Sequence, residues 1–381
     1  MIIRGKIPGT ESPVNIVVEN GKVIQIEPYQ KGSSFDFGGV DLYLCPGFFD
    51  PQVNGFGGVD FNSPRLTPEG LHQAGRSLAS TGVTHFFPTL ITSSHERMIH
   101  QLKIIADALR NDSLLRRMCL GIHLEGPYIS PEDGPRGVHP QKFIRHPEWE
   151  ELEKFQEVCE GRIKLITLAP EVKGAIPFIE KAVAHGIVIG IGHTNASEVV
   201  IEEAVLAGAR LSCHLGNAPS AQLPHYQKNI QKQLAMDQLM ISLITDGVHL
   251  HHDVVKNYIR VKGIDRIILT TDGMAGAGAS PGRYTLGDLE VEVNPDRTAR
   301  LVSNPRLAGS TLTMDCAITN VIRFAEIDFT SAVHMAAKNA QKLFPEVRGE
   351  IIPGHSADLV LFEYQKELKV LSTWIQGEKI F

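Results

Sequence analysis

Residues 163–214 read IKLITLAPEVKGAIPFIEKAVAHGIVIGIGHTNASEVVIEEAVLAGARLSCH, and this stretch decides the fold. Short β-rich runs alternate in it with helical patterns. The β-rich runs are Ile163–Leu168, Gly186–Ile191 and Arg210–Cys213, and the helical patterns are Ile176–Ala184 and Ala196–Ala207. Such alternation is typical of β/α units, in which consecutive strands are parallel. The stretch therefore predicts an α/β fold built on a parallel sheet.

The same alternation continues on both sides of this stretch. Further strand candidates are Val83–Pro88, Met118–Leu124, Met240–Thr245 and Arg266–Thr271, and further helical patterns are Glu69–Thr81, Ser94–Arg110 and His251–Val261. With a first strand that ends near Phe49-Asp50, the middle of the chain holds about eight β/α units. This number favours a (β/α)8 TIM-type barrel over an open sheet.

Both ends of the chain show the pattern of short strands. Near the N-terminus, two apolar runs flank Asn20-Gly21, which is a strong hairpin signal because both residues tolerate positive φ. A similar apolar run, Ala357–Phe362, lies near the C-terminus. We predict that residues 1–45 and 350–381 together build one small β domain and that residues 46–349 form the barrel.

The composition is that of an ordinary globular protein. The 381 residues include 37 Lys and Arg against 43 Asp and Glu, which gives a formal net charge of −6. Binding to nucleic acids or to acidic membranes normally needs a basic excess, so neither partner is expected. The five cysteines form no Cys-x-x-Cys pair, and no apolar run approaches the ~18 residues of a membrane span. We therefore expect a cytoplasmic protein with reduced thiols.

Polar residues stand where several predicted strands end. Glu125 follows one strand, His193 a second and His214 a third. In a barrel the carboxyl ends of the strands form the active site. One carboxylate and two imidazoles suit Zn²⁺ or another divalent transition metal, and three protein ligands leave a position open for water. The alternatives are hydrogen-bonded structural histidines and a carboxylate that caps the following helix.

Asp272 ends another predicted strand, in Thr270-Thr271-Asp272-Gly273. A bound metal lowers the pKa of a coordinated water to roughly 7. Asp272 then fits a general base that takes the proton of the water and later gives it to the leaving group. Together these residues indicate metal-assisted hydrolysis.

Several motifs give the chain a resemblance to a known family. They are PGFFDPQVNG (46–55), HLEGP (123–127), GHT (192–194), His214-Leu215, TDGVH (245–249), TDG (271–273), LAGSTLTM (307–314) and PGHSAD (353–358). Each motif alone is weak, but HLEGP followed by GHT and then TDG is a specific combination. Through them the chain resembles the N-acetylglucosamine-6-phosphate deacetylases of the amidohydrolase superfamily over nearly its whole length.

The resemblance implies a barrel with a small β-sandwich, a homodimer, and hydrolysis of the acetamido group of a small amino sugar. It implies that Glu125, His193 and His214 bind the metal and that Asp272 is the acid/base. It places His139 near the substrate carbonyl, where an imidazole stabilises a developing oxyanion. The positions it assigns to the sugar and its phosphate are Val138, Asn217, Ala218, His249, Leu307, Ala308 and Gly309.

Gln52-Val53-Asn54 stands where many amidohydrolases have a His-x-His that holds a second metal. Amides are poor ligands for transition metals beside imidazole, so we predict one divalent metal ion per chain. Zinc is the expected metal, with iron, manganese, cobalt or nickel as alternatives. Gln52 and Asn54 would instead orient the nucleophilic water or the substrate, and the alternative is a structural role for both.

The chain departs from the family after His214-Leu215. His225 stands where the family has an arginine that binds the phosphate of the neighbouring subunit's substrate. An imidazole is partly neutral at pH 7 and cannot form the bidentate contact of a guanidinium. Either Lys228 or Lys232 takes over this role, or the substrate is another N-acetyl sugar or N-acyl amine without the phosphate.

Two other functions compete with deacetylation as explanations of the sequence. Hydrolysis of a cyclic amide, as in dihydroorotases and hydantoinases, usually uses His-x-His and a carboxylated lysine, and Gln52-Val53-Asn54 argues against it. A catalytically inactive scaffold predicts that a ligand or the acid/base is lost. Glu125, His193, His214 and Asp272 are all present, which favours an enzyme.

Overall fold

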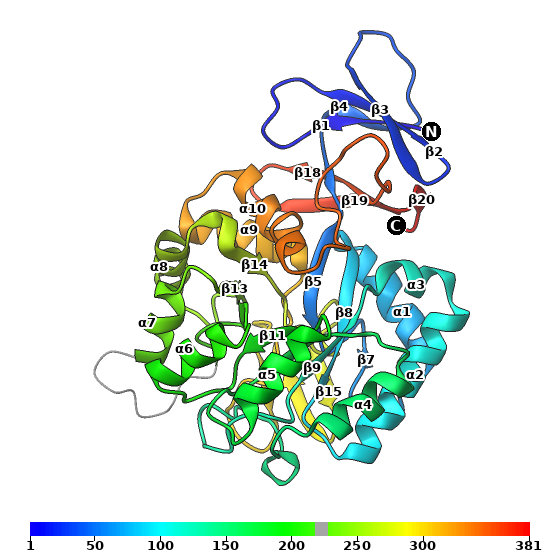
Figure 1. The fold of residues 1–381 in the computed structure, drawn as a ribbon. Coiled ribbons are helices and arrows are strands. Elements are labelled where there is room, and N and C mark those ends of the chain that lie inside the picture. The colour runs from blue at the N-terminus through cyan, green and yellow to red at the C-terminus, as the bar shows by residue number, and fades with distance from the viewer. Residues whose placement is uncertain (218–227) are drawn as a thin grey trace.

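A barrel of parallel strands forms the centre of the molecule (Figure 1). The computed structural model describes residues 1–217 and 228–381. Eight strands of the described residues pair in the order β14-β13-β12-β11-β10-β9-β8-β5, all of them parallel. They are β5 (Phe48–Val53), β8 (Val83–Ile91), β9 (Ile122–Glu125), β10 (Ile163–Leu168), β11 (Val188–Ile191), β12 (Leu211–Ser212), β13 (Met240–Leu243) and β14 (Ile267–Leu269).

Contacts between the first and the last strand close this sheet. The buried carboxylate of Asp50 accepts hydrogen bonds from the hydroxyls of Thr270 (2.8 Å) and Thr271 (2.5 Å). Just beyond the carboxyl ends of β5 and β14, the backbone N–H of Asn54 donates to the carbonyl of Gly273 at 2.8 Å. The predicted (β/α)8 barrel is confirmed.

Helices cover the outside of the barrel (Figure 1). They are α1 (Pro68–Ala79), α2 (His95–Asn111), α3 (Ser113–Met118), α4 (Trp149–Val158), α5 (Ala175–Ala184), α6 (Glu198–Leu206), α7 (Lys228–Ala235), α8 (His252–Lys262), α9 (Met314–Ala325) and α10 (Phe329–Ala336), with short 3₁₀ turns at Gln141–Phe143, Ile264–Arg266 and Asn339–Lys342. In α1, Thr67 caps the N-terminus and accepts from Gly70 N, and Leu71, Ala74 and Leu78 face the core.

One predicted strand begins later than expected. Met118 belongs to α3, because the side chain of Asp112 accepts hydrogen bonds from Leu114 N and Leu115 N and so starts a short helix. The strand itself, β9, starts only at Ile122.

Strands from both chain ends join one sheet of seven, beside the barrel (Figure 1). Its order is β20-β19-β18-β4-β1-β2-β3, and the strands are β1 (Ile2–Lys6), β2 (Val14–Glu19), β3 (Lys22–Pro28), β4 (Phe37–Pro46), β18 (Leu359–Tyr364), β19 (Leu368–Ile375) and β20 (Glu378–Lys379). Fully buried Trp374 packs in its core with Ile3, Ile16 and Leu44. Because β4 of the N-terminal part pairs with β18 of the C-terminal part, neither chain end completes the sheet alone.

Two small sheets lie among the loops after the barrel strands, and the sequence analysis predicts neither. One holds β6 (Gly55–Phe56) and β7 (Val59–Asp60), and the other holds β15 (Gly282–Leu286), β16 (Leu289–Val293) and β17 (Ala299–Leu301). The buried carboxylate of Asp60 joins them, because it accepts from Thr285 Oγ1 at 2.7 Å and from Gly287 N at 2.9 Å.

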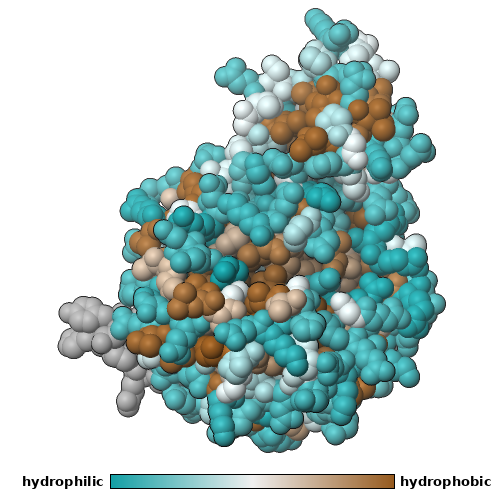
Figure 2. Space-filling view, viewed as in Figure 1, coloured by the Kyte–Doolittle hydropathy of each residue, from teal (hydrophilic) through white to brown (hydrophobic). Residues whose placement is uncertain are grey.

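Most of the surface in the view of Figure 2 is hydrophilic, and apolar groups gather over the sheet made by the chain ends. Ile24, Phe35 and Val40 are exposed in that part of the chain. Partial exposure of apolar side chains is normal for a folded protein. Among the described residues, no helix has the length and apolar character needed to cross a membrane.

Candidate metal centre and active site

Three side chains with metal-ligating atoms meet at the carboxyl ends of their strands. Glu125 is the last residue of β9, His193 follows β11 and His214 follows β12. The Oε1 atom of Glu125 lies 3.0 Å from Nε2 of His193 and 2.7 Å from Nε2 of His214. All three side chains are buried, and their ligand atoms lie within 4.8 Å of one another. The predicted ligand set is thus brought together.

The hydrogen bonds of His193 show that these residues fit a cation. Its Nδ1 lies 2.8 Å from the carbonyl oxygen of Pro135, which can only accept, so Nδ1 carries the proton. In the neutral ring Nε2 is then a lone pair that faces a carboxylate oxygen of Glu125. Two acceptors this close need a positive charge between them, and imidazole nitrogen with carboxylate oxygen is a donor set that suits zinc.

The carboxylate of Glu125 is ionised in this setting. Burial by itself would raise its pKa, but the hydrogen bonds with His193 and His214 lower the pKa of Glu125 well below its usual value. A negative oxygen between two imidazoles is what a divalent cation would require.

The backbone is strained at the centre of the site. His193, His214 and Asp272 have φ values of 50°, 29° and 50°, in the left-handed region that favours glycine. Such conformations cost free energy, and they persist where the surrounding structure fixes them, often in active sites. At Gly192 a Cβ atom would lie only 2.6 Å from Thr167 Cγ2, so the chain can approach β10 there only as glycine.

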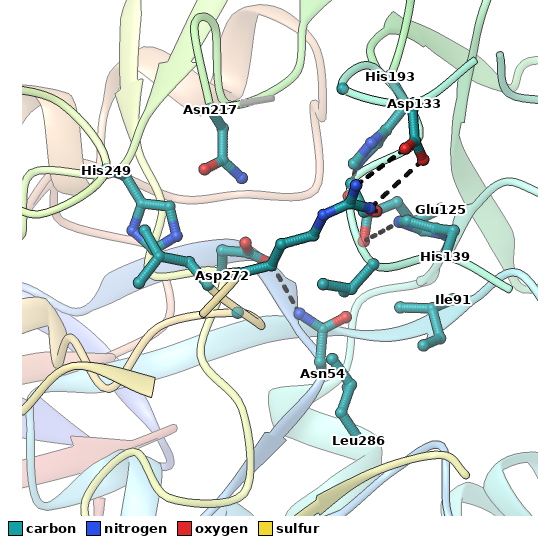
Figure 3. A pocket seen from close by; sticks show the side chains of 16 residues that line it. Asn54, Ile91, Glu125, Asp133, His139, His193, Asn217, His249, Asp272 and Leu286 are labelled. Carbon is teal, nitrogen blue, oxygen red and sulfur yellow. Dashed lines mark hydrogen bonds and ion pairs between the residues drawn. The ribbon is translucent and has the colours of Figure 1, made fainter. Parts of the chain in front are cut away.

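Asp272 stands across the site from the ligand cluster (Figure 3) and is held by two amides. Its Oδ1 accepts from Gln52 Nε2 at 2.9 Å and from Asn54 Nδ2 at 2.7 Å. Burial, together with the nearby charge of Glu125, raises the pKa of Asp272 to about 6. The amide groups of Gln52 and Asn54 therefore position the carboxylate of Asp272. Their amide oxygens have no hydrogen-bond partner among the described residues, and a role in orienting water or substrate stays a prediction.

His139 lies in the loop after β9, and its ring reaches the ligand cluster (Figure 3). Its Nδ1 lies 2.8 Å from the hydroxyl of Thr92 and accepts from Thr92 N at 3.4 Å. The proton of the neutral ring is therefore on Nε2, 4.0 Å from Glu125 Oε2. Burial lowers the pKa of His139 to about 3, so the ring is a neutral hydrogen-bond donor at pH 7.

A cavity of about 330 Å³ opens in front of these groups (Figure 3). The predicted site residues that line it are Asn54, Glu125, Val138, His139, His193, Asn217, His249, Asp272, Leu307 and Gly309. Gln52, His214 and Ala308 are buried and do not line this cavity. Ala218 and His225 lie outside the described residues.

The structure adds residues that the sequence analysis did not assign. Asp246 accepts the Nδ1 proton of His249 at 2.6 Å and fixes the ring at the cavity wall. The i, i+3 spacing of these two residues after a strand was a usable signal. The hydroxyl of Thr92 contacts His139, and the cavity is lined also by Ile91 and Arg306. The sequence around these three residues gave no signal of a role in the site.

Comparison with known proteins agrees with this geometry. Residues 43–380 match the amidohydrolase family. The N-acetylglucosamine-6-phosphate deacetylase of Bacillus subtilis is 32% identical over 96% of this chain and 92% of its own length. The N-acetylgalactosamine-6-phosphate deacetylase of Escherichia coli O157:H7 is 31% identical over 88% of this chain and 87% of its own length.

Solved structures give the same result. A mutant of the N-acetyl-D-glucosamine-6-phosphate deacetylase of Mycobacterium smegmatis, in complex with N-acetyl-D-glucosamine-6-phosphate, superposes with a TM-score of 0.91. It is 26% identical and covers 100% of this chain and 99% of that one. The resemblance that the motifs indicated is confirmed. With its barrel and its family match, this chain is a hydrolase that belongs to the amidohydrolase family.

Proposed function

We propose that the protein removes the acetyl group of an N-acetyl amino sugar, in particular N-acetylglucosamine 6-phosphate, and releases acetate and the free amine. The observation that carries the proposal is the buried cluster of Glu125, His193 and His214, with Asp272 across the same cavity. The deacetylase names of relatives at about one-third identity support the substrate class.

Glu125, His193 and His214 would hold one divalent metal ion, with zinc as the expected one. Such an ion supplies Lewis-acid activation of water and of the acetamido carbonyl. The ligands are rigidly placed: His193 is fixed by Pro135 O, and the backbone N–H of His214 donates to Ser242 Oγ at 2.8 Å. Second-sphere hydrogen bonds of this kind orient metal ligands.

Asp272 acts as the acid/base in this proposal. Its Oδ1 already accepts two amide protons, which leaves Oδ2 to take the proton of the attacking water. A pKa of about 6 leaves the carboxylate ionised at pH 7 and yet basic enough to accept a proton. The same oxygen then returns the proton to the sugar nitrogen as the carbon–nitrogen bond breaks.

His139 stabilises the reacting carbonyl group. Its Nε2–H donates toward the carbonyl oxygen as negative charge develops there. Asn217, His249, Val138, Leu307 and Gly309 would contact the sugar from the cavity wall. Ala218 and His225 stay candidates for the same role from the sequence alone, and Ala308 supports its neighbours from inside the loop.

Acetate release tests the proposal. Free and 6-phosphorylated N-acetylglucosamine, N-acetylgalactosamine and N-acetylmannosamine are incubated with zinc-loaded protein, and kcat/KM is compared. Asp272→Asn should lower kcat by orders of magnitude while about one metal ion per chain stays bound. Asp237→Asn, a change of the same kind on the exposed surface, is the control. Near-normal turnover by Asp272→Asn would remove Asp272 from the acid/base role, and lack of acetate release from every sugar would refute the function.

A further inference from the structure

One guanidinium group lines the cavity in the described part of the chain. It belongs to Arg306, directly before Leu307, which also lines the cavity. Its Nη2 lies 3.1 Å from Asp133 Oδ2, and its Nη1 donates to the carbonyl of Gly137 at 3.3 Å. Dashed lines to Asp133 in Figure 3 mark this ion pair. Arg306 therefore stands at the cavity wall opposite an acid on the loop that carries His139.

The ion pair leaves Arg306 free to change partners. The side chains of Arg306 and Asp133 are 43% and 68% exposed, and exposed pairs of this kind contribute little because water screens them. Asp133 also pairs with Arg136, so it keeps a cation if Arg306 moves away. Breaking the contact between Arg306 and Asp133 therefore costs little free energy.

The backbone of Arg306, by contrast, is firmly held. Its N–H donates to Asn304 Oδ1 at 3.0 Å, and its carbonyl accepts from Leu301 N at 3.0 Å. A fixed Cα with a partly exposed charged side chain suits a residue that binds a ligand group. The long aliphatic stem lets the guanidinium turn without moving the loop.

The cavity needs such a charge if its ligand is anionic. Three carboxyl groups, those of Glu125, Asp133 and Asp272, line the cavity. A metal held by Glu125, His193 and His214 would act on the acetamido group of the ligand, so a separate cation is needed for an anionic substituent. Of the lysines considered from the sequence, Lys232 pairs with Glu202 and is not among the lining residues. A guanidinium also matches the geometry of a phosphate better than an ammonium does, because it donates two parallel hydrogen bonds.

We propose that Arg306 binds the anionic substituent of the substrate, a phosphate monoester, from within the same chain. The inference rests on the proposed deacetylation of an amino-sugar phosphate. It gives the chain a phosphate-binding residue at a position that the sequence analysis did not consider. On substrate binding the guanidinium exchanges the Asp133 carboxylate for the phosphate, while Arg136 stays on Asp133.

The experiment compares substrates that differ only in the phosphate. Arg306→Gln is expected to lower kcat/KM for N-acetylglucosamine 6-phosphate by about 10–100-fold, mainly through KM, because a charged hydrogen-bonded pair is lost. The kcat/KM for free N-acetylglucosamine should change less than about 3-fold. Arg306→Lys should restore part of the loss. Arg300→Gln is the matched control, because Arg300 donates to Pro305 O in the same turn but does not line the cavity.

The variant Asp133→Asn distinguishes phosphate binding by Arg306 from a purely structural role, in which the ion pair with Asp133 only holds the loop in place. If Arg306 binds phosphate, Asp133→Asn leaves KM for the phosphorylated sugar unchanged or lowers it. If Asp133→Asn reproduces the Arg306→Gln defect, or if Arg306→Gln weakens both sugars equally, the inference is overturned. Circular dichroism of each variant confirms that it is folded.

A binding measurement separates this inference from the proposed function. Calorimetry with glucosamine 6-phosphate and glucosamine needs no turnover. Wild-type protein should bind the phosphorylated amine about 10–100-fold more tightly than Arg306→Gln does. Equal Kd values would refute the role of Arg306 even if acetate is released. Lack of acetate release with a clear difference in Kd would refute the deacetylation and leave the phosphate site intact.

Discussion

Replacing Gln52 by methionine should move the acidic limb of the pH profile of kcat/KM to higher pH. Gln52 Nε2 donates to Asp272 Oδ1 at 2.9 Å, and the methionine has nearly the same shape but no donor. Gln52 Oε1 has no hydrogen-bond partner among the described residues, so the change leaves no new unpaired group on its other side. The effect should therefore come mainly from the lost hydrogen bond to the Asp272 carboxylate.

The size of the shift follows from the strength of that bond. A hydrogen bond to a charged group is worth about 1.5–3 kcal/mol, and 1.36 kcal/mol corresponds to one pKa unit, so the pKa of Asp272 should rise by about 1–2 units. In the metal-free protein, with a pKa of about 6 for Asp272, the ionised fraction at pH 7 would fall from about nine-tenths to between about one-tenth and one-half. In the metal-loaded enzyme the acidic limb of the kcat/KM profile should therefore move to higher pH by about 1–2 units relative to wild type.

The assay is acetate release between pH 5 and 9 with metal-loaded protein. A bound cation lowers the pKa of Asp272 in wild type and variant alike, so the measured quantity is the difference between the two profiles. Gln101→Met is a matched control, because Gln101 is also a buried glutamine but lies on α2, outside the cavity. An unmoved limb in Gln52→Met, with or without a lower kcat, would refute the assignment of Asp272 as the titrating base.

Three further predictions concern the metal, the small sheets and the sheet built by the chain ends. His193→Ala should lose the bound metal in dialysis against a weak chelator, and metal analysis that still finds one ion per chain would contradict the ligand set. Burial raises the pKa of Asp60 to about 6, so the folded state favours the protonated carboxyl. Protonation of Asp60 therefore contributes up to about 3 kcal/mol to the free energy of unfolding. This contribution is present below about pH 4 and is lost as the pH rises through 6. Carbon-13 NMR of the Asp60 carboxyl should show titration near pH 6, and titration near pH 4 would disprove the shift. Trp374→Ala should lower the free energy of unfolding in urea by about 3–5 kcal/mol, whereas Trp149→Ala, at a half-buried position, should cost much less, and equal losses would contradict the core assigned to Trp374.

The fold was predictable because its signals are local. Alternation of apolar runs and helical patterns needs only neighbouring residues, and parallel strands must bring their carboxyl ends to one edge. That rule alone put Glu125, His193 and His214 together, although they are up to 89 positions apart in the chain. The error at Met118 was also local, since the cap at Asp112 decides between helix and strand there.

The partners of the site residues were harder to predict, because they come from distant parts of the chain. The bond from Gln52 to Asp272 joins residues 220 positions apart, and nothing in either local sequence indicates it. The ion pair of Arg306 with Asp133 spans 173 positions. The strands around Gly287 were within reach, since Tyr284 to Val293 alternates around a Gly-Asp turn, which is a hairpin signal.

The left-handed backbone at His193, His214 and Asp272 lowers the stability of the folded state. Glycine at any of the three would relieve steric crowding around Cβ, by an amount on the order of 1 kcal/mol. The two imidazoles and the carboxylate at these positions therefore serve the chemistry of the site at a cost in folding free energy, so the most stable form of this fold and its catalytic form differ in sequence.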